Sequence, residues 1–192
     1  IIIIPVEKNH EYTAVIDTLS SEGSGIARID GYTLFVPQTV PGDTVRLLVL
    51  KTKTSYGYAK AIEIITPSKN RVVPPCEHFS KCGGCQLMSL DYLEQLNFKR
   101  HTVADALGRI GGFNAEPEII GMTPPERYRN KMVFPFAPGG RWGFYRQHSH
   151  DVVILKDCLL GDKLNAEIMN TVSDYIKRFN IPVYDEKSHT GI

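Results

Sequence analysis

Residues 23–43 read GSGIARIDGYTLFVPQTVPGD, a sequence from which the fold of the first part of the chain can be predicted. Its two apolar runs, 26–29 and 32–36, are joined by Asp30-Gly31, a pair that is typical of a tight β-hairpin turn. Pro41-Gly42-Asp43 predicts a second turn directly afterwards. The stretch therefore predicts a hairpin of two short strands, followed by a turn into the next strand.

Further strand-like runs lie on both sides of this hairpin, at residues 12–18, 44–51 and 56–65. About five short strands in residues 8–66 fit a small closed barrel, because closure removes exposed sheet edges. The run Gly23-Ser24-Gly25-Ile26-Ala27-Arg28 is similar to half of a dinucleotide-binding fingerprint. Because Arg28 stands at its sixth position and no helix follows, we interpret this run as a barrel turn.

A linker and a second domain follow the predicted barrel. Residues 67–75 contain three prolines and are predicted to be the linker. We expect a fold that is mainly β with an α+β part: a small OB-like barrel in residues 1–66, then an α+β domain in residues 76–192.

Two helices and three strands are predicted in this second domain. Ser89 is expected to cap the first helix, which Gly111-Gly112 end. Asn180 and Pro182 end the second helix. Apolar residues at helical spacing predict both helices: Leu93, Leu96, Val103, Leu107 and Ile110, then Leu164, Ile168, Val172, Ile176 and Phe179. Strand-like runs lie between them, at 131–137, 141–146 and 151–155.

Four cysteines are the most specific chemical feature: Cys76, Cys82 and Cys85 lie in the run CEHFSKCGGC, and Cys158 lies far downstream. Gly83-Gly84 let the backbone turn tightly, so that Cys82 and Cys85 can face one centre. Four thiolates hold either tetrahedral zinc or an iron–sulfur cluster. Three clustered cysteines with one distant partner favour the cluster, while zinc and inert or disulfide-bonded cysteines stay open as alternatives.

The charge is unevenly distributed, although 22 Lys and Arg residues nearly balance 21 Asp and Glu residues. Residues 51–71 hold five basic residues against Glu63 alone, and residues 127–150 hold five basic residues and no acidic one. Two basic stretches on an otherwise acidic chain predict a face that binds a polyanion.

Aromatic residues accompany the second basic stretch, as is typical of proteins that hold single-stranded RNA. The predicted RNA contacts are Arg127, Arg129, Lys131, Tyr145 and Arg146, with Lys51, Lys53 and Lys60 on the barrel. We expect these arginines to have no acidic partners nearby. The alternative interpretation is that Phe134, Phe136, Trp142 and Phe144 are core residues and that the charges only form a solvated face.

No catalytic constellation is visible in the sequence. His148-Ser149-His150-Asp151 contains residues suited to acid–base chemistry, but neighbours on a strand point oppositely, and a turn is expected here. No run is apolar enough to span a membrane and no signal peptide is recognisable, so we expect a cytoplasmic protein without membrane contact. Because Tyr184 onward resembles the start of another element, we also expect a fragment of a longer protein.

The two parts together resemble the RNA (uracil-C5)-methyltransferase family, in its branch with an N-terminal TRAM domain and an iron–sulfur centre. The resemblance lies in Gly23-Ser24-Gly25, Asp30-Gly31, Phe35-Val36-Pro37 and Pro41-Gly42-Asp43, then in Pro75-Cys76, Cys82-Gly83-Gly84-Cys85-Gln86, Arg127-Tyr128-Arg129-Asn130-Lys131, Gly143-Phe144-Tyr145-Arg146 and Cys158. It implies that the four cysteines hold a 4Fe-4S cluster, that the barrel is a TRAM domain and that the partner is RNA, with 23S ribosomal RNA as the target.

The resemblance also implies chemistry that these 192 residues do not contain. Family members continue into a domain that binds S-adenosylmethionine and carries the catalytic cysteine, so no catalytic or methyl-donor residue is assigned here. We therefore expect the RNA-recognition part of an enzyme that transfers a methyl group to uracil C5. The alternatives are a stand-alone, metal-stabilised RNA-binding module and an electron-transfer protein. No protein partner is implied.

Overall fold

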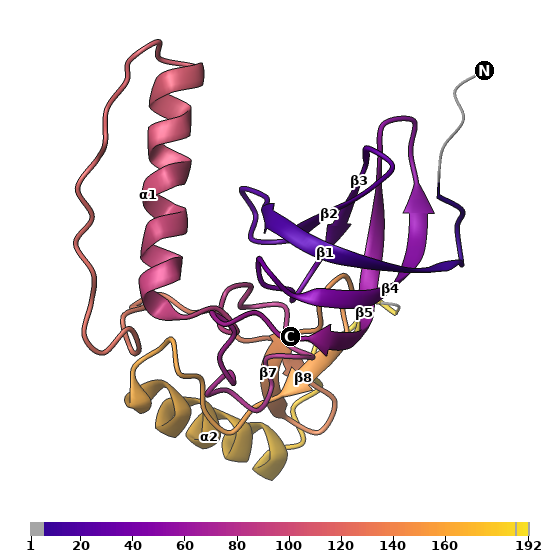
Figure 1. Ribbon diagram of the computed structural model, residues 1–192. Coiled ribbons are helices and arrows are strands. Elements are labelled where there is room, and N and C mark those ends of the chain that lie inside the picture. Colours follow the sequence, from indigo (N-terminus) through magenta and orange to yellow (C-terminus); the bar gives the residue numbers. More distant parts are fainter. Residues whose placement is uncertain (1–5, 187, 192) are drawn as a thin grey trace. The chain divides into compact units, whose positions relative to one another are not determined.

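The computed structural model describes residues 6–186 and 188–191, and its first part is a closed five-stranded β-barrel (Figure 1). The strands are β1 (Glu11–Leu19), β2 (Gly25–Ile29), β3 (Tyr32–Val36), β4 (Thr44–Thr52) and β5 (Tyr56–Thr66). Their order is β1-β2-β3-β5-β4, and β4 pairs again with β1. All pairs are antiparallel except β3–β5. The predicted barrel is confirmed.

The barrel core comes from residues that alternate along each strand. On β4, Val45, Leu47 and Val49 are fully buried, while the residues between them point outward. The predicted hairpin turn between β2 and β3 is present, because Asp30 and Gly31 both have positive φ angles, 47° and 79°. Two residues with positive φ fit the twist of a two-residue hairpin, and Asp-Gly tolerates that conformation.

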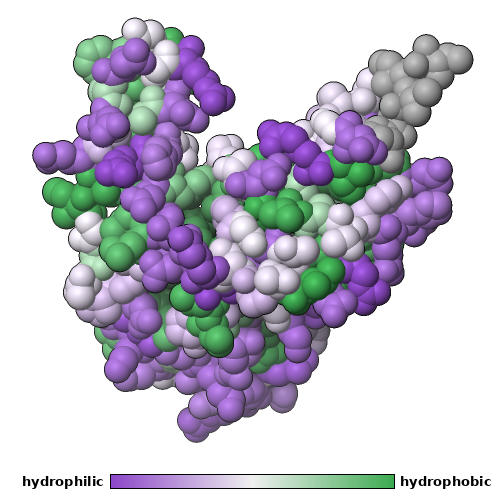
Figure 2. All heavy atoms as spheres, viewed as in Figure 1, coloured by the Kyte–Doolittle hydropathy of each residue, from purple (hydrophilic) through white to green (hydrophobic). Residues whose placement is uncertain are grey.

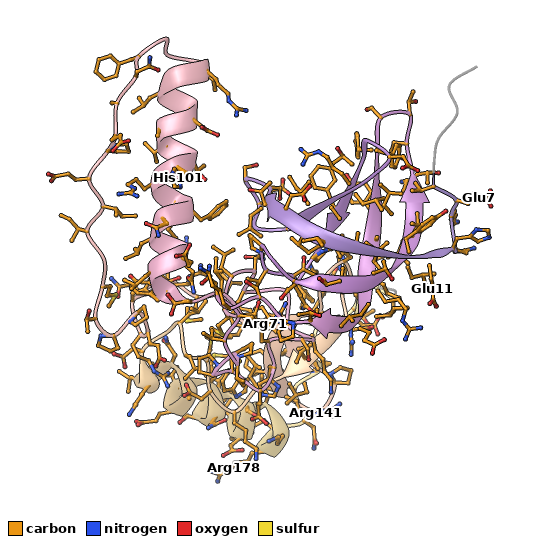
Figure 3. The ribbon with its side chains drawn as sticks, in the orientation of Figure 1. Glu7, Glu11, Arg71, His101, Arg141 and Arg178 are labelled. Atoms are coloured by element: carbon orange, nitrogen blue, oxygen red, sulfur yellow. The ribbon has the colours of Figure 1, made fainter. Side chains whose placement is uncertain are left out.

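A buried carboxylate joins the barrel to the chain that leaves it. Asp43, in the turn before β4, is fully buried. Its carboxylate accepts hydrogen bonds from Val40 N (2.7 Å), Ser68 N (2.9 Å) and the Arg71 guanidinium (2.6 and 3.0 Å). Arg71 is labelled in Figure 3 and also donates to the Gln38 carbonyl (3.1 Å). Burial alone would raise the pKa of Asp43, but these hydrogen bonds outweigh it and hold the pKa below its usual value.

The predicted linker is therefore partly fixed to the barrel. Arg71 forms a bridge with Leu90, and Val72 N donates to the Ser89 carbonyl (2.9 Å). These bonds guide the chain toward helix α1 (Tyr92–Arg109). The predicted cap at Ser89 is wrong: Asp91 caps the helix, because its side chain accepts from Leu93 N (3.0 Å), whereas Ser89 is buried.

The chain forms two compact units. One contains the described residues up to Pro74 together with Gln86–Gly121, so the barrel and α1 belong to it. The other contains Pro75–Cys85 and the described residues from Met122 onward. None of the described helices is long and apolar enough to cross a membrane.

The second unit is built on a small antiparallel sheet, β6 (Phe136–Ala137), β7 (Arg141–Tyr145) and β8 (Val152–Ile154), with helix α2 (Lys163–Arg178). Trp142 is buried and its indole N–H donates to Asn170 on α2 (3.0 Å). The predicted strand at 131–137 is too long, because only its last two residues pair. Pro135 has no N–H group to donate to a ladder.

The apolar positions that predict α2 do not all face this core. Ala166, Met169 and buried Ser173 lie on the packed side of the helix. The helical periodicity is correct, yet most of the predicted apolar positions point away from the unit. These exposed residues are Leu164, Ile168, Val172 and Phe179, and Tyr175 lies among them.

We predict that Asp43→Ala lowers the free energy of unfolding by about 3–5 kcal/mol, because it leaves the guanidinium of Arg71 without its carboxylate. The wild-type contribution is present above about pH 4, where the unfolded carboxyl is ionised, and is lost as pH falls through the lowered folded pKa. Urea unfolding at several pH values measures both effects.

Arg46→Ala is the matched control for this substitution. Arg46 also pairs with two carboxylates, those of Glu11 and Glu63, but all three side chains are exposed to solvent. This substitution should therefore change the stability little. Equal destabilisation by the two substitutions would refute the special role of Asp43.

Candidate cysteine centre and nucleic-acid interface

Three of the four cysteines lie in one segment, residues 76–85, which we call the cysteine loop. Backbone hydrogen bonds fix this loop against the end of β7. Gly83 N donates to the Tyr145 carbonyl (3.0 Å), and Cys82 forms an antiparallel bridge with Arg146. A Cβ atom at Gly83 would lie 3.2 Å from that carbonyl oxygen, so a glycine permits this close approach.

The fourth cysteine, Cys158, follows β8 and is held by an arginine. Arg127 forms a two-pronged ion pair with Asp157 (2.9 and 2.6 Å). The same guanidinium donates to the carbonyls of Cys158 (2.8 Å) and Gly161 (3.0 Å). Asp157 in turn accepts from Cys158 N (2.7 Å). We call this group the Arg127 clamp, and it fixes the backbone on both sides of the Cys158 thiol.

The four thiols influence one another electrostatically. The pKa of Cys85 is raised to about 12, first by burial and then by Cys158, Cys82 and Cys76, while Arg129 lowers it. The pKa of Cys82 is also raised, first by burial and then by Cys158 and Cys76, against a hydrogen bond from Gly84 N–H. Cys158 and Cys76 therefore lie close enough to Cys82 and Cys85 to raise the pKa of both thiols.

The four cysteines are all free and all partly buried. Across residues 6–186 and 188–191, no three His, Cys, Asp or Glu side chains are grouped tightly enough to hold a metal ion as they stand. Zn–S bonds of about 2.3 Å would place the sulfurs of one zinc site about 3.8 Å apart. A cubic cluster needs wider spacing, because each thiolate binds a different iron. Four free thiols are the donor set that such a cluster requires.

The expectation that the arginines of residues 127–150 lack acidic partners is wrong for Arg127. This guanidinium pairs with Asp157, which lies 30 residues away in the sequence, and the pair raises the pKa of Arg127. Because its hydrogen bonds are used inside the unit, the argument for Arg127 as an RNA contact is removed.

The other predicted contacts in this stretch have exposed side chains: Arg129, Lys131, Tyr145 and Arg146. Arg129 is close enough to Cys85 to lower its pKa, and its N–H donates to the Leu160 carbonyl (2.9 Å). Tyr145 and Arg146 hold the cysteine loop through their backbones, so their side chains emerge beside it. No ion pair involves these basic side chains among the residues that the structure describes.

The four aromatic residues that the alternative interpretation assigned to the core do lie there. The core cluster contains Trp142, with Phe134, Phe136 and Phe144 packed against it. Phe134 contacts Trp142 edge to face, with ring centroids 5.0 Å apart. These four are core residues, whereas Tyr145 is exposed and contacts only His150 among the described aromatic rings (5.4 Å).

On the barrel, Lys51, Lys53 and Lys60 are all exposed. Three aromatic residues of the barrel that were not predicted as contacts, Phe35, Tyr56 and Tyr58, touch one another. Because these residues alternate with buried ones along the strands, the sequence could have placed them on the outer face of the barrel. The pairing of β3 with β5, which brings them together, cannot be seen in the sequence.

A comparison with protein families identifies the barrel. Residues 5–62 match the TRAM domain. The expected TRAM domain is thus confirmed, and the match ends within β5.

Curated relatives match almost the whole chain. An uncharacterized RNA methyltransferase of Clostridium tetani is 43% identical over 98% of this chain and 42% of its own length. Another from Staphylococcus epidermidis is 37% identical over 97% of this chain and 42% of its own length. The chain is homologous to the N-terminal part of these RNA methyltransferases, and it spans about 42% of their length.

A solved structure has the same fold over most of the chain. It is the Pyrococcus abyssi tRNA (uracil-54, C5)-methyltransferase in complex with S-adenosyl-L-homocysteine, with a TM-score of 0.67 and 26% identity. The match covers 93% of this chain and 40% of that chain. The resemblance to RNA methyltransferases is thereby confirmed for the N-terminal part.

We predict that Arg127→Ala lowers the free energy of unfolding by about 2 kcal/mol, because it removes charge-assisted hydrogen bonds to Asp157 and to two carbonyls. Chemical unfolding monitored by the fluorescence of Trp142 measures this loss in the unit concerned. The control is Arg129→Ala, which removes an exposed guanidinium from the same stretch and should change stability little. A matched loss in both variants would show that the Arg127 clamp has no special role.

Proposed function

We propose that this chain is the RNA-recognition part of a uracil-C5 RNA methyltransferase whose target is 23S ribosomal RNA. The methyltransferase part of the proposal is supported by the homology over 98% of the chain with an RNA methyltransferase, together with the fold shared with a uracil-C5 enzyme. The ribosomal target rests on the sequence resemblance alone. S-adenosylmethionine would bind in a part of the protein that these 192 residues do not include. The residues of this chain would bind and orient the RNA.

The RNA contacts that we propose lie on both units. Arg129, Lys131 and Arg146 would neutralise phosphates, and Tyr145 would stack on a base. Lys51, Lys53 and Lys60 would hold phosphates on the TRAM domain. A uracil must leave its stack before its ring can react, so contacts that hold the neighbouring nucleotides favour the reaction.

We further propose that Cys76, Cys82, Cys85 and Cys158 hold a 4Fe-4S cluster. Four free, partly buried cysteines support this ligand set, because Cys158 and Cys76 lie close enough to raise the pKa of Cys82 and of Cys85. When bound, the cluster would supply a covalent cross-link between the cysteine loop and the Cys158 segment. Methyl transfer to uracil consumes no electrons, so a structural role is sufficient.

Protein purified without oxygen is expected to contain about four irons and four sulfides per chain. Cys158→Ala should lose this iron and melt at a lower temperature, because ligand binding and folding are coupled. Metal analysis, the visible spectrum and thermal unfolding measure the three quantities.

His78→Ala is the control for the iron measurement, because His78 lies in the cysteine loop and is no proposed ligand. It should keep the iron. One zinc and no iron in the wild type would contradict the cluster and favour a stand-alone RNA-binding module. Iron retained by Cys158→Ala would remove Cys158 from the ligand set.

The double substitution Arg129→Ala and Arg146→Ala is expected to weaken RNA binding and to reduce its salt dependence. Each lost phosphate contact on a single strand should change the slope of log K against log salt by about 0.7. Titrations with a 23S ribosomal RNA fragment at several salt concentrations measure the slope.

Lys177→Ala with Arg178→Ala is the matched control, because it removes two exposed cations from the end of α2. The control should keep the wild-type slope. The same result for Arg129→Ala with Arg146→Ala would exclude both arginines from the interface. Tighter binding of a transfer RNA than of the ribosomal fragment would contradict the proposed target.

A further inference from the structure

Three aromatic rings contact one another on the outside of the barrel. Phe35 on β3 lies 5.7 Å from Tyr56 and 5.8 Å from Tyr58, both on β5, between ring centroids. Tyr56 and Tyr58 lie 5.7 Å apart. We call these three residues the aromatic platform. Tyr58 is exposed and Phe35 and Tyr56 are half-buried, so the group is partly open to solvent.

The strand pattern fixes the direction of these side chains. On β5, Gly57 and Ala59 are buried inside the barrel, so Tyr56 and Tyr58 lie on the outer side. Tyr58 is 43% exposed. The parallel pairing of β3 with β5 then sets Phe35 opposite Tyr58. In Figure 2, hydrophobic residues (green) and residues of intermediate hydropathy (white) lie among hydrophilic ones (purple) on the visible face of the molecule.

A buried tyrosine supports the platform from below. The Tyr32 hydroxyl accepts a hydrogen bond from Lys53 N (3.1 Å) and lies within hydrogen-bonding distance of the carbonyls of Lys53 (2.7 Å) and Tyr56. Lys53 N also donates to the Tyr56 carbonyl (2.8 Å), which closes the turn between β4 and β5. The strand that carries Tyr56 and Tyr58 is therefore ordered before any ligand binds, which lowers the entropy cost of binding.

Three lysines surround these rings. Lys51 pairs with Tyr58 across β4 and β5, Lys60 is the next outward residue on β5, and Lys53 lies in the turn. None of the three has an ion-pair partner within the described part of the chain. A hydrogen bond with Tyr56 raises the pKa of Tyr58, and Glu22 raises it further, so this ring is a neutral phenol near neutral pH.

We propose that Phe35, Tyr56 and Tyr58 form a stacking site for unpaired RNA bases, and that Lys51, Lys53 and Lys60 hold the phosphates beside them. Aromatic faces bind unpaired bases and lysines bind the backbone, and strand faces of OB-like barrels carry such sites. The site rests on the proposed function, since it deepens RNA recognition by the TRAM domain. It goes beyond that proposal because it adds a stacking site on the TRAM domain, where the proposal has only lysines that hold phosphates.

The experiment uses this chain and a fluorescein-labelled oligouridylate of roughly 12 nucleotides, within the range that one OB fold covers. Fluorescence anisotropy measures binding by Tyr58→Leu, which keeps an apolar side chain without the ring, and by Tyr58→Phe, which keeps the ring. Phe35→Leu repeats the test on β3. Val15→Ala is the control for an exposed apolar residue on β1, where Val15 is 51% exposed, and thermal unfolding confirms that each variant is folded.

We expect each leucine variant to bind about 5- to 100-fold more weakly, with the salt slope unchanged. Tyr58→Phe and Val15→Ala should bind like the wild type. Lys51→Gln with Lys60→Gln should weaken binding and reduce the slope, because these residues contact phosphates.

Two other outcomes would overturn the proposal in different ways. Leucine variants that bind like the wild type, while the lysine variant binds weakly, would remove the stacking site but keep RNA recognition by the barrel. A wild-type chain that binds neither this RNA nor the ribosomal fragment would remove the proposed function and the stacking site together.

Discussion

The buried carboxylate of Asp43 is the interaction on which the first unit depends. It binds two backbone N–H groups and one guanidinium, and these belong to the turn before β4 and to the chain after β5. A single ionised group therefore fixes the end of the barrel and the start of the path toward α1. Because the carboxylate is fully buried, each of its partners is necessary to offset the cost of removing it from water.

The second unit is also held by an ion pair that binds backbone groups, but here the pair positions a cysteine. There, Arg127 and Asp157 form the partly buried ion pair, and the backbone that it fixes carries Cys158. The cysteine loop is fixed independently, through the backbone of Tyr145 and Arg146 at the end of β7. The cysteine loop and Cys158 are thus each positioned by hydrogen bonds of the protein. The exposed side chains of Tyr145 and Arg146 lie at the end of β7, where the loop is fixed.

Local signals in the sequence predicted much of this structure, whereas contacts between residues far apart in the sequence could not be predicted. Asp30-Gly31 and Pro41-Gly42-Asp43 placed the barrel turns correctly, because turn chemistry depends on adjacent residues. The ion pairs of Asp43 with Arg71 and of Arg127 with Asp157 join residues that are 28 and 30 positions apart in the sequence. No local sequence pattern predicts such pairs. The aromatic platform was missed for the same reason, since it exists only after β3 pairs with β5. The predicted strand at 131–137 failed where Pro135 interrupts the ladder.

The parallel pairing of β3 with β5 also affects the order in which the contacts of the barrel form during folding. The hairpin of β2 and β3 joins neighbouring residues through a two-residue turn, so its formation closes a very short loop. The contact of Phe35 with Tyr58 closes a much longer one, and it needs β4 and β5 to be already folded back. Loop-closure entropy makes such a contact late. The outer aromatic surface is therefore assembled after the β2–β3 hairpin, so a partly folded chain would have this hairpin before it had the surface.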